Sequence, residues 1–184
     1  MRRGPGQRAG LTRERVLAAA RALAAERGLA GLSMRTLAAA LGVRPNALYS
    51  HVASKDALVD ALLDGVLAEV EVPDAGAPDP LAGVHAMMTS TYRVLLAHAD
   101  LVPAFLARQG ARGPNAQHLG VVLRALLGRA GVQGDAAQEA LNVLVVHAIG
   151  SAAFASGAPL GGDGGAAHFD RGLRWLLTGI AAGH

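Results

Sequence analysis

Helical spacing is the feature that most limits how this chain can fold. Through most of its length apolar residues recur three and four positions apart, as in Val16, Ala20 and Leu23, and glycine or proline separates one such segment from the next. Forty of the 184 residues are Ala and 27 are Leu, both good helix formers, whereas aromatic residues make up only 3%. The pattern predicts an all-α protein.

Residues typical of helix ends divide the N-terminal third of the chain into four short helices. Side chains that can accept a hydrogen bond from a backbone N–H favour the N-cap position, and proline suits the first turn because its missing N–H costs nothing there. Glycine favours the position just beyond a helix. The expected N-caps are Thr12, Ser33 and Ser54, the first-turn proline is Pro45, and the terminating glycines are Gly28 and Gly42.

The clearest break in the chain is the segment PDAGAPDP at 73–80, which contains three prolines and two aspartates. We place a domain boundary there. The sequence then predicts a flexible basic arm over 1–11, an N-terminal helical domain over 12–71 and a C-terminal helical domain over 72–184. Five helices are expected in the last of these, at 81–98, 101–109, 114–130, 135–156 and 166–181.

Charge is unevenly distributed along the chain. Residues 1–55 carry nine Arg, one Lys and two Glu, a net charge of +8, whereas residues 56–184 carry seven Arg and twelve acids, a net charge of −5. This asymmetry indicates an anionic partner for the N-terminal segment only. Nucleic acid and a membrane surface both satisfy it.

Residues 33–52 have the pattern of a helix-turn-helix, with two short helices joined by Leu41-Gly42-Val43. Leu37, Ala38, Val43 and Leu48 are spaced to pack the two helices together. Arg can pair with guanine, Asn with adenine, and an alanine methyl can touch that of thymine. Two ordinary core helices would show a similar turn, but the +8 segment around this pair favours DNA binding. The residues left for the outer face are Arg44, Pro45, Asn46, Ala47, Tyr49 and Ser50.

Lys55 is the only lysine in the chain and falls in the first turn of an expected helix. A cation there opposes the positive end of the helix dipole, typically by some tenths of a kcal/mol. A phosphate between the ammonium group and the free N–H groups would remove this conflict. We therefore expect Lys55 to contact a phosphate, although a solvated lysine beside Asp56 is the ordinary alternative.

Five spaced elements together resemble the DNA-binding domain of the tetracycline-repressor (TetR) family over about residues 12–70. They are GLAGLS at 28–33, R-x-LA at 35–38, LGV at 41–43, ALY-x-HV at 47–52 and K-x-x-L at 55–58. The resemblance implies a dimeric bacterial transcription regulator, usually a repressor that a small ligand releases from its operator in double-stranded DNA. It also implies that Arg35 reads a base, that Ser33 and Thr36 lie near the DNA backbone, that Arg44, Pro45, Asn46 and Ala47 enter the major groove, and that Tyr49, His51 and Lys55 hold phosphates.

The C-terminal segment resembles the same family more loosely, through LLAHAD at 95–100. The position at which tetracycline repressors carry a metal-binding His is Phe105 here, and their ligand-binding Asn and Phe positions fall at Met87 and Thr91. The tetracycline–magnesium site is therefore not reproduced. Ala, Leu and Met with few polar groups suit a small apolar or aromatic effector instead, unless these side chains simply fill the core. The candidate ligand residues are Met87, Met88, Thr91, Tyr92, Phe105, Asn142 and His147.

The segment 135–156 is apolar on nearly all sides, which indicates burial all round and therefore a partner subunit on one side. Small residues allow close helix approach, and the last helix carries a matching apolar stripe. We expect the two helices to form half of an intersubunit four-helix bundle in a homodimer, as the family resemblance also implies. The expected interface residues are Ala148, Ser151, Ala152, Ala155, Phe169, Leu173, Leu176 and Ile180.

Several classes of function lack support in the sequence. The absence of cysteine excludes disulfides, thiolate zinc sites, iron–sulfur clusters and cysteine nucleophiles. There is no G-x-S-x-G, P-loop, H-E-x-x-H or dinucleotide-binding motif, and the histidines lack metal-ligand spacing, so neither an enzyme, a cofactor nor a metal is expected. We expect a cytoplasmic protein without a membrane partner. A regulator without an effector, a transcriptional activator and a membrane-surface protein remain as alternatives.

Overall fold

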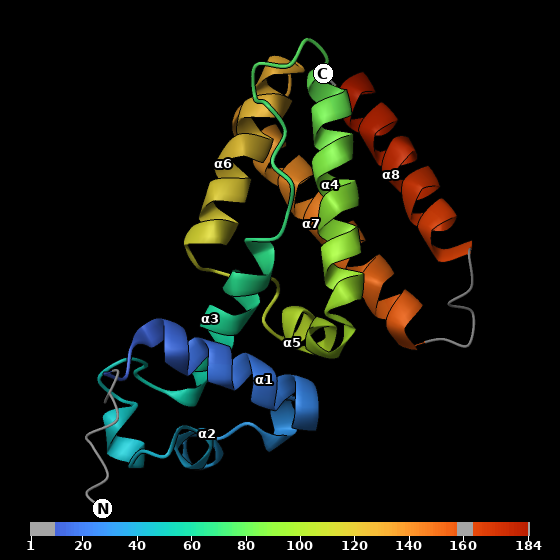
Figure 1. Cartoon of the computed structure of the whole chain (residues 1–184). Coiled ribbons are helices and arrows are strands. Elements are labelled where there is room, and N and C mark those ends of the chain that lie inside the picture. Colours follow the sequence, from blue (N-terminus) through green and yellow to red (C-terminus); the bar gives the residue numbers. More distant parts are fainter. Residues whose placement is uncertain (1–9, 158–163, 184) are drawn as a thin grey trace, which may run out of the picture. The chain divides into compact units, whose positions relative to one another are not determined.

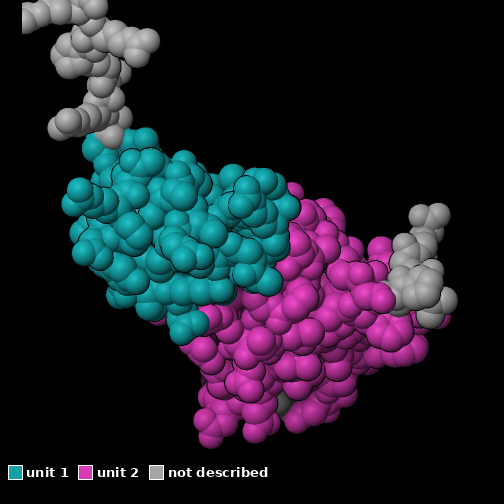
Figure 2. All heavy atoms as spheres, turned by 90° about the horizontal axis from the view of Figure 1, so that it is seen from below, with its two compact units in different colours: residues 1–62 teal, residues 63–184 magenta. Residues whose placement is uncertain are grey.

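The computed structural model describes residues 10–157 and 164–183, and every regular element in these ranges is a helix, as Figure 1 shows. The all-α prediction is confirmed. The chain divides into two compact units, residues 1–62 and 63–184, which are coloured separately in Figure 2. The predicted basic arm over 1–11 lies outside the described residues except for its last two.

Unit 1 begins with α1 (Arg13–Gly31) and α2 (Met34–Leu41). The predicted N-cap at Thr12 is present, since its hydroxyl accepts a hydrogen bond from the backbone N–H of Arg15 at 3.3 Å. Gly28 interrupts the helical backbone of α1 near its end. Gly42 ends α2 in the left-handed conformation at φ 66°, which glycine adopts without steric cost.

One hydrophobic core holds unit 1 together. Leu37 and Ala38 of α2 and Leu48 of the following turn are buried in it, as predicted, together with Val16 and Leu23 of α1. Burial of a leucine contributes about 1.5–3 kcal/mol, so this cluster fixes the second element of the helix-turn-helix against the first two helices.

That second element differs from the prediction. It is the short 3-10 helix η1 (Pro45–Ala47), followed by hydrogen-bonded turns, rather than an α-helix over 45–52. The backbone N–H groups of Ala47 and Leu48 bond to carbonyls three residues earlier. The Ser50 hydroxyl donates to the Ala47 carbonyl at 2.9 Å, while the N–H of His51 bonds to the carbonyl of Leu48 instead. The side-chain bond competes with the α-helical ladder at this point.

The last helix of unit 1, α3 (Lys55–Leu67), also supplies the first residues of unit 2. Leu58 and Leu62 belong to the hydrophobic core of unit 1. The compact units therefore divide between Leu62 and Leu63, earlier than the boundary that we placed at 71–72. The proline-rich segment 73–80 lies within unit 2, where the guanidinium of Arg129 donates to the carbonyls of Ala75 and Ala77.

All five helices predicted for the C-terminal region are present in unit 2. They are α4 (Pro80–Ala97), α5 (Val102–Ala107), α6 (Pro114–Arg129), α7 (Gly134–Gly157) and α8 (Gly164–Ala182). A short 3-10 helix, η2 (Ala99–Leu101), precedes α5. Helix α7 contacts each of the other four, and in Figure 1 it passes behind α4. By length and composition alone α7 could cross a membrane, which is weak evidence by itself; its contacts with four helices bury only part of its apolar surface.

Candidate DNA interface and ligand cavity

The residues predicted for the outer face of the helix-turn-helix lie at the surface of unit 1. Leu48 points into the core, and its neighbours in the turn therefore point outward; Tyr49 is 51% exposed. This arrangement presents a guanidinium, an amide, a methyl group and a phenol to a partner, which are the groups that direct base reading and phosphate contact require. The exposed candidates are Arg35, Arg44, Pro45, Asn46, Ala47, Tyr49, Ser50 and Lys55.

Ser33 and Thr36 are half-buried and bonded to each other. The Ser33 hydroxyl accepts from the backbone N–H of Thr36 at 3.1 Å, and the Thr36 hydroxyl accepts from the N–H of Ser33 at 2.9 Å. This reciprocal pair is a capping box, which satisfies two free donors at the start of α2. Both hydroxyls therefore stabilise the start of α2. The sequence predicted only that they lie near the DNA backbone and did not predict this structural role.

A contact that the sequence did not suggest fixes the far end of the segment 44–51, which we call the recognition turn. The guanidinium of Arg13, in the first turn of α1, donates to the backbone carbonyl of His51 at 2.8 Å. His51 itself is half-buried. Glu14 follows Arg13. Hydrogen bonds from the backbone of Glu14 and from the side chain of Thr12 lower the pKa of the Glu14 carboxyl. No sequence signal separates Arg13 from the other arginines of the basic segment.

Lys55 occupies the predicted position, as the first residue of α3, and is exposed. Ser54 precedes it and accepts a hydrogen bond from the backbone N–H of Ala57 at 3.1 Å, as expected of an N-cap. The ammonium group of Lys55 thus lies at the end of a helix that attracts anions.

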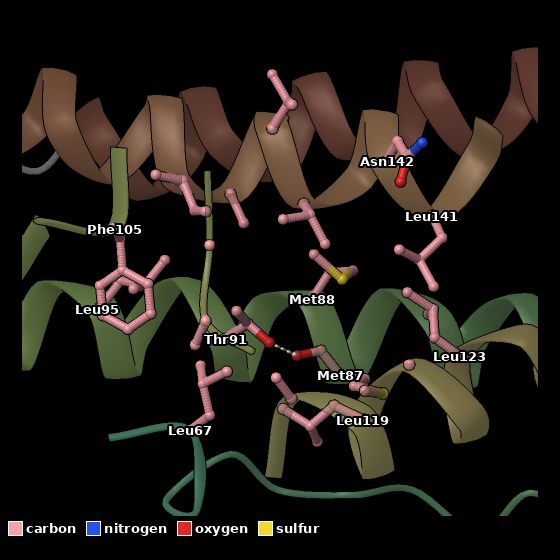
Figure 3. A pocket seen from close by; sticks show the side chains of 18 of the residues that line it. Leu67, Met87, Met88, Thr91, Leu95, Phe105, Leu119, Leu123, Leu141 and Asn142 are labelled. Atoms are coloured by element: carbon pink, nitrogen blue, oxygen red, sulfur yellow. Dashed lines mark hydrogen bonds between the residues drawn. The ribbon is translucent and has the colours of Figure 1, made fainter. Parts of the chain in front are cut away.

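Unit 2 contains a cavity of about 560 Å³ among α4, α5, α6 and α7. Five of the seven predicted ligand residues line it: Met87, Met88, Thr91, Phe105 and Asn142. Figure 3 shows Phe105 and Asn142 at opposite ends, with Met88 between them. In the described part of the chain, no Asp, Glu, Lys, Arg or His lines this cavity. Its lining can therefore accept an apolar or aromatic molecule but offers no charge to pair with an ionised one.

The other two predicted ligand residues, Tyr92 and His147, do not line the cavity. Their rings stack on the two faces of Phe169 from α8, with centroid distances of 4.1 Å and 4.9 Å. A ring nitrogen of His147 also lies 3.1 Å from the carbonyl oxygen of Phe169. Burial raises the pKa of the Tyr92 phenol. This three-ring stack attaches α8 to α4 and α7, and the prediction for Tyr92 and His147 is corrected accordingly.

The remaining lining residues had no sequence signal. They include Leu67 at the end of α3, Leu119 and Leu123 of α6, and the turn Gln109–Ala111. Only packing reveals that these positions face one space, because each belongs to an ordinary apolar stripe or to a turn.

The predicted interface residues on α7 and α8 divide into two groups. Ala148, Ala152 and Leu173 are fully buried within one subunit, and Phe169 is 2% exposed, so no partner can cover them. Ala148 lines the cavity instead, and Phe169 stacks on Tyr92 and His147, so the prediction for these four buried residues is corrected. Ser151, Ala155, Leu176 and Ile180 are half-buried. The exposed apolar side chains of the two helices are Val143, Val146, Phe154 and Trp175, the last three 70% exposed; we call these four residues the α7/α8 surface.

Two histidines of α4 and its C-cap pair with carboxylates. His85 lies 2.8 Å from Asp170, which also bonds to Arg174, and His98 lies 2.9 Å from Glu69. Desolvation alone would raise the pKa of Asp170, but the hydrogen bond to His85 and the charge of Arg174 lower it overall. Within the described ranges no three His, Asp or Glu side chains are grouped to hold a metal ion.

An exposed helix-turn-helix face on one compact unit and a second helical unit with a mainly apolar cavity define a DNA-binding regulator of the one-component type. Comparison with known proteins agrees. Residues 16–62 match the family model described as bacterial regulatory proteins, tetR family. An HTH-type transcriptional regulator of Saccharopolyspora erythraea is 31% identical over 94% of this chain and 85% of its own length. The chain belongs to the tetR family, and it is a DNA-binding transcriptional regulator.

Two solved structures show the same fold over nearly the whole chain. ActR of Streptomyces coelicolor, in complex with actinorhodin, has a TM-score of 0.85 and 27% identity, covering 95% of this chain and 97% of that protein. BioQ in complex with its natural double-stranded DNA operator has a TM-score of 0.76 and 27% identity, covering 94% of this chain and 99% of that one.

Proposed function

We propose that this protein is a cytoplasmic, dimeric repressor that binds an inverted-repeat operator and leaves it when a small, uncharged, apolar or aromatic effector enters the cavity of unit 2. It acts by binding and not by catalysis. The observation that carries the effector part of the proposal is the cavity itself, which lies among four helices of unit 2 and is lined mainly by apolar side chains.

The DNA part of the proposal rests on the surface of unit 1. Arg35, Arg44 and Asn46 are exposed on or beside the recognition turn, and Lys55 stands at the start of the next helix. The first three serve as base-reading residues and Lys55 as a phosphate contact. The BioQ–operator complex supports this reading, because it shows a protein of this fold on double-stranded DNA.

The chemistry of the lining selects the effector. Thr91 already donates its hydroxyl to the carbonyl of Met87 at 2.9 Å, and Asn142 accepts from Gln138 at 3.0 Å. A ligand therefore meets mainly aliphatic, Met and Phe side chains, among which Thr91, Gln109 and Asn142 are the polar ones. Burying an ionised ligand here without a partner charge would be strongly unfavourable. The structure of ActR in complex with actinorhodin supports the proposal that a protein of this fold binds a ligand.

The dimer part of the proposal rests on the α7/α8 surface. Phe154 and Trp175 are large apolar side chains with most of their area exposed to solvent. Aromatic residues are enriched in the buried centres of protein interfaces. A second copy of this chain, related by a two-fold axis, covers this surface and presents two recognition turns to DNA.

A selection experiment tests the DNA part. The purified protein is mixed with random DNA fragments, and the bound fragments are sequenced after several rounds. We expect an inverted repeat whose half-sites lie about one helical turn, 34–36 Å, apart or a multiple of that distance. Fragments without a common sequence would contradict the proposal.

A ligand screen tests the effector part. Neutral aromatic compounds and their ionised analogues are compared by thermal shift, and compounds that stabilise the protein are tested for release of the selected operator. A Thr91→Trp variant fills the cavity and should lose the thermal shift while still binding operator. Val121→Trp, at an exposed position of α6, is the matched control. Stabilisation by ionised analogues alone would overturn the assignment of an uncharged effector.

A further inference from the structure

Asp64, near the end of α3, is the only buried carboxylate in the part of the chain that the structure describes, with 5% of its surface exposed. Its oxygens accept three hydrogen bonds from α6. One comes from the side-chain amide of Asn115 at 3.0 Å, and two come from the backbone N–H groups of Asn115 and Ala116 at 3.3 Å and 3.0 Å. The Asn115 amide also donates to the main-chain carbonyl of Asp64 at 3.0 Å.

These bonds replace the N-cap of α6. Gly113 occupies the N-cap position and has no side chain to offer, and Pro114 in the first turn has no N–H. The free donors at this helix end are therefore satisfied by a carboxylate from another helix, where an anion is also favoured by the helix dipole. A Cβ on residue 113 would lie 2.1 Å from the carboxyl carbon of Asp64, so only glycine permits this approach.

The two helices that this contact joins also contribute residues to the wall of the cavity. Ala116, whose N–H bonds to Asp64, lines the cavity, and so does Leu67, one turn after Asp64 on α3. The turn that leads into α6 lines it as well. Within that turn Gln109 is held at φ 56°, a left-handed conformation that non-glycine residues adopt only at a cost, and Gly110 follows at φ 100°.

The other end of α3 belongs to the DNA-binding unit. Leu58 and Leu62 lie in the core of unit 1, and Lys55 begins the helix without a break before Asp64. A displacement of α6 or of its leading turn by a ligand therefore acts directly on the helix that carries a DNA-contacting residue.

We propose that Asp64 couples the cavity to DNA binding: its trans cap on α6 is closed in the state that binds operator, and an effector that displaces the cavity wall opens it. This inference rests on the proposed function and adds the residue through which the regulation of the cavity passes. Asp64 is a positioning residue, because it acts on DNA through α3. Since coupling is reciprocal, operator binding must also tighten the cap.

Hydrogen exchange with and without operator tests this without any effector. In the wild-type protein, the selected operator should slow exchange of the peptide covering residues 108–120 by about fivefold or more, the lower end of typical coupling. Asn at position 64 has the same shape as Asp but lacks the charge and one acceptor oxygen. The Asp64→Asn variant should still bind operator, but operator should not change the exchange of this peptide. Gly113→Ala breaks the same contact from the α6 side and should behave alike. Glu71→Gln, an equal charge change at an exposed position, is the control.

The outcomes separate the two proposals. The role of Asp64 would be overturned if operator did not slow hydrogen exchange of this peptide in the wild-type protein. It would also be overturned if operator still slowed that exchange in Asp64→Asn and Gly113→Ala. A wild-type protein that selects no operator would overturn the proposed function instead. Because a merely structural Asp64 would lower the melting temperature without removing the response to operator, each variant is also unfolded thermally.

A second readout uses the neutral dye N-phenyl-1-naphthylamine as a cavity probe. The dye should weaken operator binding by the wild-type protein about fivefold or more, and this ratio should fall toward one in Asp64→Asn although the dye still binds. If the dye binds and the variant keeps the wild-type ratio, the cap does not carry the coupling.

Discussion

At the scale of single residues, Lys55 offers the simplest test of how the protein holds DNA. Each phosphate that a protein neutralises contributes about −0.9 to the slope of log affinity against log salt concentration. Replacing Lys55 by Ala should therefore weaken binding to all DNA sequences alike and make the slope shallower by about 0.9 for each phosphate that is no longer neutralised. Titrations at several salt concentrations measure this. Arg124→Ala, an exposed cation of α6, should leave the slope unchanged, and an unaltered slope in Lys55→Ala would remove Lys55 from the interface.

Arg35 and Arg44 should behave differently, because we place them against base edges. Removing a bidentate hydrogen-bonded pairing with guanine costs about 1–3 kcal/mol and relaxes the preference at one base pair. Affinities of Arg35→Ala and Arg44→Ala for a set of single-base operator variants provide the measurement. An equal loss of affinity on every operator would instead identify the two arginines as phosphate-binding residues.

The surface exposure of most of the DNA-binding candidates could be predicted residue by residue, but the polar residues that organise the fold could not. Asp60 and Asp64 stand four positions apart on α3 and look in the sequence like two solvent-facing acids. Asp64 is buried only because the glycine at 113 leaves room beside a helix end. Such a contact joins residues about fifty positions apart, and no local pattern encodes it.

At the scale of elements, the capping box of α2 gives a quantitative prediction. Replacing an N-cap serine by alanine typically costs about 1 kcal/mol. Ser33→Ala should lower the free energy of unfolding by that amount, measured by urea denaturation. Ser50→Ala removes an exposed hydrogen bond of the recognition turn and should cost less than about 0.5 kcal/mol. An equal loss in the two variants would mean that the capping box contributes nothing of its own.

The boundaries of the elements followed from the sequence wherever a cap marks them. Thr12, Ser33, Gly42 and Ser54 all act as predicted. The recognition turn differed from the prediction because the backbone N–H groups of Ala47, Leu48 and His51 bond to carbonyls three residues earlier instead of four. Helical spacing is the same for both kinds of helical turn, so the sequence pattern could not distinguish them.

At the scale of the whole molecule, the position of the subunit interface is the main prediction. Trp175→Glu places a charge on the α7/α8 surface. Loss of a buried aromatic anchor typically costs about 2 kcal/mol or more of association free energy. The variant should be a folded monomer by light scattering and circular dichroism, with weak binding to a single half-site. Val121→Glu, at another exposed apolar position, should remain dimeric. A folded Trp175→Glu dimer would place the interface elsewhere.

The sequence predicted that α7 and α8 meet a partner subunit, but it did not indicate which of their faces are exposed. Helix α7 is apolar around most of its circumference, so its pattern does not separate the side that packs in its own subunit from the side that remains open. Ala152 and Leu173 are buried against neighbouring helices, and Phe154 and Trp175 are not. That assignment depends on the packing of five helices together.

Trp175 is the only tryptophan in the chain and lies on the surface where we expect the second subunit. Its fluorescence therefore reports on that surface alone. Emission from an indole in water lies at longer wavelength than emission from a buried one, so dilution of the unmodified protein through its dissociation range should move the spectrum to the red. The chain thus carries a built-in optical probe of its own assembly, and no dye needs to be attached.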